Sequence, residues 1–309
     1  MSTNKRVLLN SLVILGCLLL VACGSGEQLL RSIVNDLDED FVDEMNAYAR
    51  LDAQQKLRVN RLSKKVKYWV QTQQLPKLRA LLADIAGQME RAEVVDQASY
   101  LHLFDFLSQP FSFADSDPIM AELAGLAYSL SPQQVQQVGR QQDKEWAELA
   151  RQSRKKTLKQ ENKEIIQSLQ YVLRDLGVHL DSDDQKYLFT ILATRQSVVE
   201  SILQAQQNLN QQFRQLLELL ELLEHSQTNN KIDAANFKRQ FVHLWRQSES
   251  LHQQVDPAVW QHNRQLMVDM LDMVFSQLNA IDKQKLVRRL KDYIVLLDEL
   301  SQVTSSSRQ

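Results

Sequence analysis

The stretch "SLSPQQVQQV" (residues 129–138) contains, in order, the signals that start an α-helix. Ser131 suits the N-cap position, and Pro132 suits the first helical position because its missing N–H is not needed there. Gln134 stands three residues after the cap, where its side chain can return a hydrogen bond and complete a capping box. The stretch therefore predicts a helix that begins at Pro132.

The same start signal, an apolar residue followed by a capping residue, recurs before residues 53, 182, 257 and 283 at irregular intervals, which does not indicate a repeat protein. Only seven glycines and five prolines occur in 309 residues, so a β-rich fold with many tight turns is not expected. The composition, rich in good helix formers, predicts an all-α fold, an elongated bundle of about nine or ten helices. The expected helices are 28–48, 52–73, 76–94, 96–108, 118–129, 132–176, 181–225, 232–253, 257–278 and 282–301.

Two of these helices are unusually long and should form an antiparallel hairpin. Gly177 stands where a glycine commonly ends a helix, so the helix 132–176 should stop there and the helix 181–225 should return alongside it. Within the first arm, the segment "RQSRKKTLKQENKE" (151–164) is polar on all sides. A helix of that kind is not expected in a core, so this segment should project from the bundle or bridge two parts of it.

The beginning of the chain has the pattern of an export signal. Two basic residues precede an apolar run at 7–21, which ends in "LVAC" (20–23) and is shorter than the roughly 20 residues of a membrane span. This ending resembles the lipobox of bacterial lipoproteins. The resemblance implies cleavage after Ala22 and attachment of acyl chains such as palmitate to Cys23. The alternative is an ordinary signal peptide in which the cysteine has no role.

The expected organisation follows from that leader. We expect a cleaved lipoprotein signal peptide (1–22), a lipidated N-terminus with a short linker (23–27), a single helical domain (28–302) and a disordered tail (303–309). Gly24 follows the cysteine where aspartate would favour retention in the inner membrane, so the resemblance points to the periplasmic face of the outer membrane. The expected partners are the membrane, through the lipid anchor, and a periplasmic or outer-membrane protein; the oligomeric state stays open.

Composition excludes several kinds of chemistry. Both cysteines, at 17 and 23, lie in or next to the leader, so the mature chain should contain no disulfide and no zinc–cysteine site. The formal charge is −2 for the whole chain, and loss of the two basic residues of the leader leaves 34 Lys+Arg against 38 Asp+Glu, about −4. A slightly acidic protein is not expected to bind nucleic acid.

No catalytic, cofactor or metal site is expected. The acidic run "NDLDEDFVDE" (35–44) lacks the glycine and spacing of a calcium loop, and the chain has no nucleophile elbow, Walker loop or dinucleotide-binding glycine motif. The alternative is a hydrolase-like envelope enzyme with an unrecognised acidic or histidine site. No two histidines have metal-chelating helical spacing; they are His102, His179, His225, His243, His252 and His262.

Three tryptophans are candidates for a partner-binding surface. Trp69, Trp146 and Trp245 lie on predicted amphipathic helices, where a large aromatic side chain is most often a core anchor. The alternative is that they line an exposed groove, because helical hairpins commonly bind extended or helical segments in such a cleft.

Several short motifs occur in a characteristic order over nearly all of the mature chain. They are "IVNDLD" (33–38), "LDAQQ" (51–55), Trp69 followed by "QLP" (74–76), "LSPQQ" (130–134), "RKK" (154–156) and "RDLG" (174–177). Together they resemble an uncharacterised family of proteobacterial lipoproteins, although Val34 and Val70 replace the tyrosine and histidine common there. The two glutamine motifs also resemble the LTxxQ signature of small periplasmic stress chaperones. The family resemblance implies location and fold but no activity. The anchor, the helices and the absence of catalytic motifs predict a non-enzymatic binding, scaffold or chaperone-like role in the bacterial envelope.

Overall fold

The computed structural model describes residues 26–91, 95–108, 116–225 and 233–302. These residues form α-helices with short π- and 3₁₀-segments, and no β-strand occurs among them, which confirms the all-α prediction. The expected leader, Cys23 and the tail 303–309 lie outside the described residues. No helix within the described ranges combines the length and apolar character that a membrane span requires.

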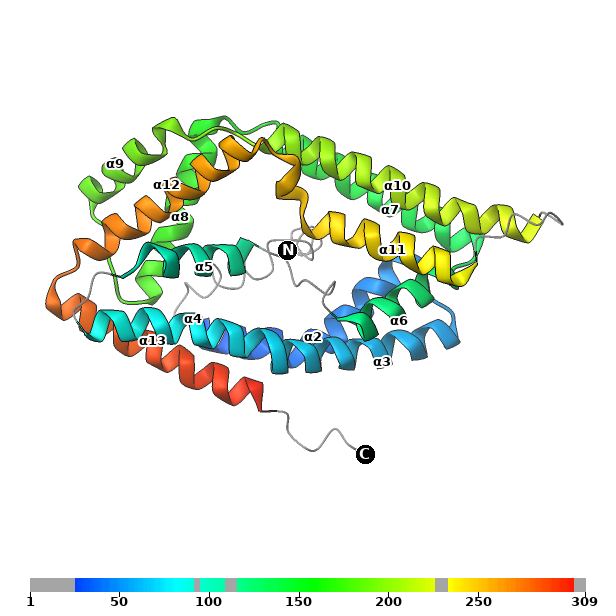
Figure 1. Cartoon of the computed structure of the whole chain (residues 1–309), viewed down its shortest axis with the longest axis horizontal. Coiled ribbons are helices and arrows are strands. Elements are labelled where there is room, and N and C mark those ends of the chain that lie inside the picture. Colours follow the sequence, from blue (N-terminus) through cyan, green and yellow to red (C-terminus); the bar gives the residue numbers. More distant parts are fainter. Residues whose placement is uncertain (1–25, 92–94, 109–115, 226–232, 303–309) are drawn as a thin grey trace.

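The helices follow one another along an elongated body (Figure 1). They are α2 (Gly26–Ala49), α3 (Ala53–Trp69), the π-helix η1 (Val70–Gln74), α4 (Leu75–Glu90), α5 (Gln97–Ser108), α6 (Asp117–Tyr128), α7 (Pro132–Ser153), α8 (Leu158–Asp175), α9 (Ser182–Ile191), η3 (Leu192–Thr194), α10 (Val199–His225), α11 (Ala234–Glu249), η4 (Leu251–Gln254), α12 (Pro257–Ser276) and α13 (Ala280–Ser301).

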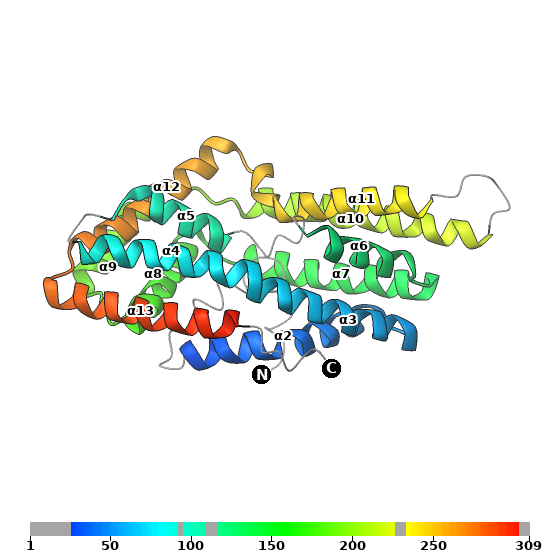
Figure 2. The ribbon, with the colours of Figure 1, turned by 60° about the horizontal axis from the view of Figure 1, so that its bottom comes forward.

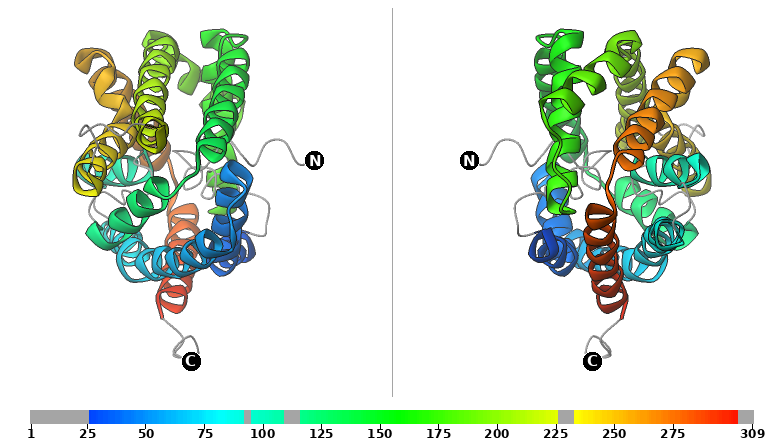
Figure 3. Two further views of the ribbon diagram at one scale, coloured as in Figure 1. Left: turned by 90° about the vertical axis from the view of Figure 1, so that its right-hand side faces the viewer. Right: turned by 90° about the vertical axis from the view of Figure 1, so that its left-hand side faces the viewer.

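Six helices surround the core at one end of the molecule. Each packs against the next in the order α2, α3, α6, α11, α10, α7 and back to α2, and Figure 3 shows this ring end-on. Its interior contains an aromatic stack in which Phe237 and Phe241 lie 6.1 Å apart between ring centroids, and Phe241 and Trp245 lie 5.9 Å apart. We call this region the aromatic core.

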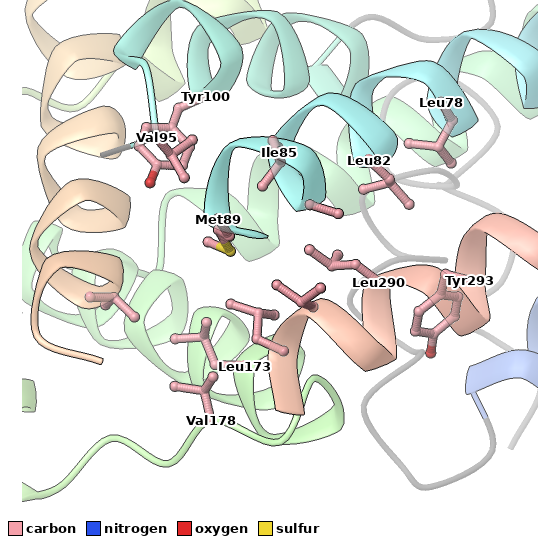
Figure 4. Close-up of a cluster of buried hydrophobic side chains, with 14 of the residues drawn as sticks. Leu78, Leu82, Ile85, Met89, Val95, Tyr100, Leu173, Val178, Leu290 and Tyr293 are labelled. Carbon is pink, nitrogen blue, oxygen red and sulfur yellow. The ribbon is translucent and has the colours of Figure 1, made fainter. Parts of the chain in front are cut away.

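A second core occupies the other end, among α4, α5, α8, α9, α12 and α13, with η1 and the start of α2 at its edge. The most extensive helix contact in the molecule joins α4 to α13. Figure 4 shows Ile85 and Met89 of α4 facing Leu290 of α13. We call this region the aliphatic core. Leu37 and Trp69 pack against both cores, so α2 and the α3–α4 rod connect the two ends.

The expected antiparallel hairpin is present, but neither arm is a single helix. The first arm divides into α7 and α8, and the second into α9 and α10; α7 packs on α10, and α8 packs on α9 (Figure 2). The predictions of uninterrupted helices over 132–176 and 181–225 were therefore wrong. Each arm breaks where the chain passes from one core to the other: α7 and α10 contribute to the aromatic core, and α8 and α9 contribute to the aliphatic core.

The polar segment 151–164 does not project from the bundle. Arg154 ends α7, and Thr157 then caps α8 through a capping box with Gln160. Further along, Asn162 is buried, 6% exposed, and its amide donates to the Leu192 carbonyl at 2.9 Å. Most of the segment is exposed, so its polarity reflects contact with solvent as well as a helix break that is stabilised by internal hydrogen bonds.

Two predicted helix starts contact one another. Ser131 and Asp52 both cap through complete capping boxes, as expected. The glutamines of the two boxes meet: Gln134 donates its amide to Gln55 Oε1 at 2.7 Å, and Gln55 donates to the Ser129 carbonyl at 2.8 Å. Gln55 is only 4% exposed, so these hydrogen bonds satisfy a buried amide and join the starts of α3 and α7.

The remaining helix ends also follow from local chemistry. Gly177 has φ +82°, and the Val178 N–H donates to the Leu173 carbonyl at 2.7 Å, which is a Schellman ending as predicted. Asp181 caps α9, also as predicted. The expected cap at Asp282 was wrong, because Asn279 caps α13 three residues earlier.

Candidate functional site

A groove lies on the surface where the α3–η1–α4 rod passes the start of α6. Its volume is about 550 Å³. The rod supplies most of the lining, and the first turn of α6 supplies the rest. The lining residues are Lys64, Lys65, Tyr68, Trp69, Thr72, Gln73, Gln74, Lys77, Ser116, Pro118 and Ile119.

The π-helix explains how the rod passes through this position without a break. Pro76 has no N–H to donate to the Thr72 carbonyl and would collide with it in a regular α-helix. The chain instead widens by one residue, so that the Leu75 N–H bonds to the Val70 carbonyl five residues back. The prediction that separate helices would end at 73 and begin at 76 was wrong for this reason.

The groove is positively charged, and most of its lysines form no ion pair with another described residue. Lys65 forms an ion pair with Glu122 of α6. Lys64 and Lys77 are exposed and make no hydrogen bond or ion pair with another described residue. Beside these ammonium groups Tyr68 is 57% exposed, so the groove combines free cations with an aromatic surface.

A second hollow of about 430 Å³ lies beside the first, on the face of α11. It is lined by Asp117, Ala235, Lys238, Arg239, Val242, His243 and Arg246. Lys238 and Arg239 are exposed and form no ion pair within the described parts of the chain. Helix α6 packs on both α3 and α11, and its first turn contributes to the lining of both hollows, so it separates them.

The three predicted tryptophans are not gathered into one site. Trp69 lines the groove and packs against both cores. Trp146 on α7 donates its indole N–H to the Leu203 carbonyl at 3.3 Å, and Trp245 on α11 donates to Glu249 at 2.7 Å. Only Trp69 therefore belongs to the candidate site, and Cys23, the predicted lipidation site, lies outside the described residues.

The acidic and histidine side chains of the described residues are dispersed. No group of three or more that could hold a metal occurs among them. The Asp175 side chain, 2% exposed, accepts a hydrogen bond of 2.5 Å from the Tyr293 hydroxyl and lies 3.7 Å from Arg289. Burial, reinforced by the hydrogen bond to Asp175, raises the pKa of Tyr293 well above its ordinary value. This buried carboxylate is thus engaged in packing α8 against α13.

The sequence contains one signal for the groove, and the spacing of the apolar residues reveals it. Apolar residues along the rod recur at steps of three or four, except for a step of five from Val70 to Leu75. Such a step, just before Pro76, indicates a one-residue insertion in a continuous helix. The pairing of Lys65 with Glu122, which leaves its neighbours free, depends on tertiary contacts and had no local signal.

Comparison with protein families gives a match over part of the chain. Residues 138–268 are similar to the family of the Parkin co-regulated protein. No curated protein and no solved structure matches the chain. The resemblances to uncharacterised proteobacterial lipoproteins and to LTxxQ chaperones were therefore wrong. Two of the motifs, "LDAQQ" and "LSPQQ", are capping boxes, which any capped, glutamine-rich helix can contain.

The matched residues cover fewer than half of the chain and run from α7 to the middle of α12. They include the broken hairpin and its polar contacts. Asn263 of α12 is among these contacts: its side chain accepts from the Gln196 N–H at 3.0 Å and donates to the Gln196 carbonyl at 2.7 Å. The basic groove on α3, η1 and α4 lies outside the matched residues.

Proposed function

We propose that the protein is a lipid-anchored, non-enzymatic binding protein of the bacterial envelope, attached through Cys23 to the periplasmic face of the outer membrane. The location rests on the leader: a basic start, an apolar run and the ending "LVAC" at 20–23. Several acyl chains on one cysteine would make detachment negligible, since each buried CH₂ contributes ~0.8 kcal/mol. The helical body would then act at the membrane surface.

The observation that supports a binding role is the basic groove. Lys64 and Lys77 have no partner among the described residues and lie next to the exposed ring of Tyr68. Charged residues with no internal partner contribute little to folding, whereas they can steer and select a partner of opposite charge. The described side chains that line this groove include no carboxylate and no imidazole, which favours binding there over hydrolysis by acid–base chemistry.

Metabolic labelling with palmitate in a bacterial host tests the anchor. The wild-type chain should be labelled, and its mature form should begin at residue 23. Cys23→Ala should abolish the label, whereas the control Cys17→Ala should retain it because that residue is removed with the leader. An unlabelled wild-type chain, or a mature form that still carries residues 1–22, would contradict the anchored location.

Site-specific photocrosslinking in intact cells tests the binding role. A benzophenone side chain is placed at Tyr68 and, as a matched control, at Tyr187 of α9, which is similarly exposed at 55%. Crosslinked products should form from position 68, and they should weaken when Lys64 and Lys77 are changed to glutamate. Equal products from both positions, insensitive to these changes, would contradict binding in the groove.

A further inference from the structure

We infer that the partner is an acidic, extended protein segment that lies across the start of α6 and occupies both hollows. The inference rests on the proposed binding function and adds the chemistry of the partner. The first observation is the charge of this surface. The two hollows together contain four basic side chains that have no partner among the described residues. These are Lys64, Lys77, Lys238 and Arg239.

Acidic groups in the same place do not neutralise this charge. Glu122 is already paired with Lys65, and the described residues that line the two hollows include one carboxylate, Asp117. Asp117 stands in the first turn of α6, where the helix dipole is positive and partly offsets the negative charge. The surface is therefore complementary to a ligand with several negative charges.

The two hollows are adjacent. Ser116 and Pro118 line the groove on α3–α4, while Asp117, between them in sequence, lines the hollow on α11. A ligand that passes from one hollow to the other needs to cross only the first turn of α6. A single extended segment can thus contact the basic residues of both α3–α4 and α11.

The other lining groups favour a polypeptide over a phosphate polymer. Gln73 and Gln74 present amides that can both donate to and accept from a peptide backbone, and Tyr68 presents an exposed aromatic surface for an apolar side chain. Phosphate chains are recognised mainly by bidentate arginines and converging N–H groups. Among the described residues, the groove on the rod is lined by lysines and no arginine, whereas the hollow on α11 is lined by Arg239 and Arg246. The preference for a polypeptide therefore rests on the groove on the rod.

Fluorescence anisotropy with the full chain in detergent micelles tests this inference. The probe is a labelled peptide of about twelve residues with alternating Asp/Glu and Leu/Tyr, and the reference peptide has Asn/Gln in place of the acids. The acidic peptide should bind more tightly, and its affinity should fall as salt rises. Equal binding of the two peptides would overturn the inference.

Three double variants then locate the contact. Lys64→Gln with Lys77→Gln, and Lys238→Gln with Arg239→Gln, should each weaken the acidic peptide about tenfold by removing two charges at the interface. The matched control is Lys159→Gln with Lys163→Gln, two exposed and unpaired lysines of α8, which should leave the affinity unchanged. Circular dichroism checks that all three fold.

Each other outcome contradicts a defined part of the inference. An effect of the Lys64/Lys77 pair alone would overturn a segment that spans both hollows, and an equal effect of the control pair would overturn a specific site. Displacement of the peptide by polyphosphate at far lower charge concentration would identify a phosphate polymer instead. A crosslink from Tyr68 without affinity for acidic peptide would overturn the partner class while the binding function stands.

Discussion

Two of the connections between the cores differ in form. On one side, α3 and α4 form a continuous rod, and a single π-turn at 70–74 carries the helix past Pro76 without a break (Figure 1). On the other side, both arms of the hairpin break, and polar side chains connect the breaks. Glu161 pairs there with Arg195 at 2.8 Å, and Arg154 donates two hydrogen bonds to Glu200 at 2.9 and 3.0 Å.

The two crossings differ in which groups form hydrogen bonds with the backbone N–H and C=O groups. The π-turn keeps the backbone of the rod hydrogen-bonded internally, so the side chains around it are free to face solvent and form a groove. The breaks in the hairpin expose backbone groups, and nearby side chains must satisfy them. Lys64 and Lys77 of the rod are therefore available for binding, whereas the nearly buried Glu161–Arg195 pair of the hairpin is engaged within the fold.

Glu161→Ala should have the largest effect on the hairpin crossing. Glu161 and Arg195 are only 12% and 14% exposed in their side chains, so the change leaves a nearly buried guanidinium without its carboxylate. We expect a loss of about 3 kcal/mol in the free energy of unfolding, measured with urea. Glu200→Ala removes the exposed pair at the same crossing and should change stability within error; a large effect there would contradict the distinction.

Thr157→Ala should have a smaller effect at the same crossing. The Thr157 hydroxyl accepts from the Gln160 N–H at 3.3 Å and caps α8. Its loss should reduce the free energy of unfolding by about 1 kcal/mol, whereas Thr157→Ser should restore most of it. If alanine and serine behave alike, the break at 154–157 does not depend on the cap.

Removal of the π-turn should change the free energy of unfolding less than the loss of Glu161 or of the Thr157 cap. Deletion of Gln73 combined with Pro76→Ala restores an ordinary α-helical count between α3 and α4, and both sides of the rod keep their register. The free energy of unfolding should change by less than about 1 kcal/mol, because both sides keep the same core contacts. Crosslinking from Tyr68 should nevertheless weaken, since the groove loses part of its lining; severe unfolding would show that the π-turn is structurally essential.

Acid should affect the exposed pair of the hairpin crossing only at low pH. Hydrogen bonding and charge from Arg154 lower the pKa of Glu200 below its ordinary value. The contact is therefore complete above the ordinary glutamate pKa and is lost as pH falls through the lowered value. NMR titration of the Glu200 carboxyl should show this shift, and Arg154→Gln should return the pKa toward normal; an unshifted wild-type value would mean that the pair does not form in solution.

Local signals predicted how helices begin better than how far they extend. The capping boxes at Asp52 and Ser131 and the glycine ending at Gly177 were all recognised, because each depends on a few neighbouring residues. Thr157 and Gln160 form an equally good box in the sequence, but the surrounding polar residues are also compatible with a continuing helix. Which alternative is adopted depends on where the two cores lie.

The candidate site shows the same limit. The aromatic Trp69 was identified, and the five-residue step before Pro76 was present in the sequence, but the unpaired state of Lys64 and Lys77 could not be deduced. Lysines are common on polar helix faces, and most of them have no particular role. Their meaning here depends on α6, which pairs with Lys65 and leaves the others free.

The sequence by itself determined the helical class, most helix starts and the glycine that turns the hairpin, because capping and φ preferences act over only a few residues. The tertiary structure decided that there are two cores, that the hairpin breaks between them, and that two basic hollows meet at α6. These features depend on which apolar faces are buried together, and that choice is made between segments far apart in the chain.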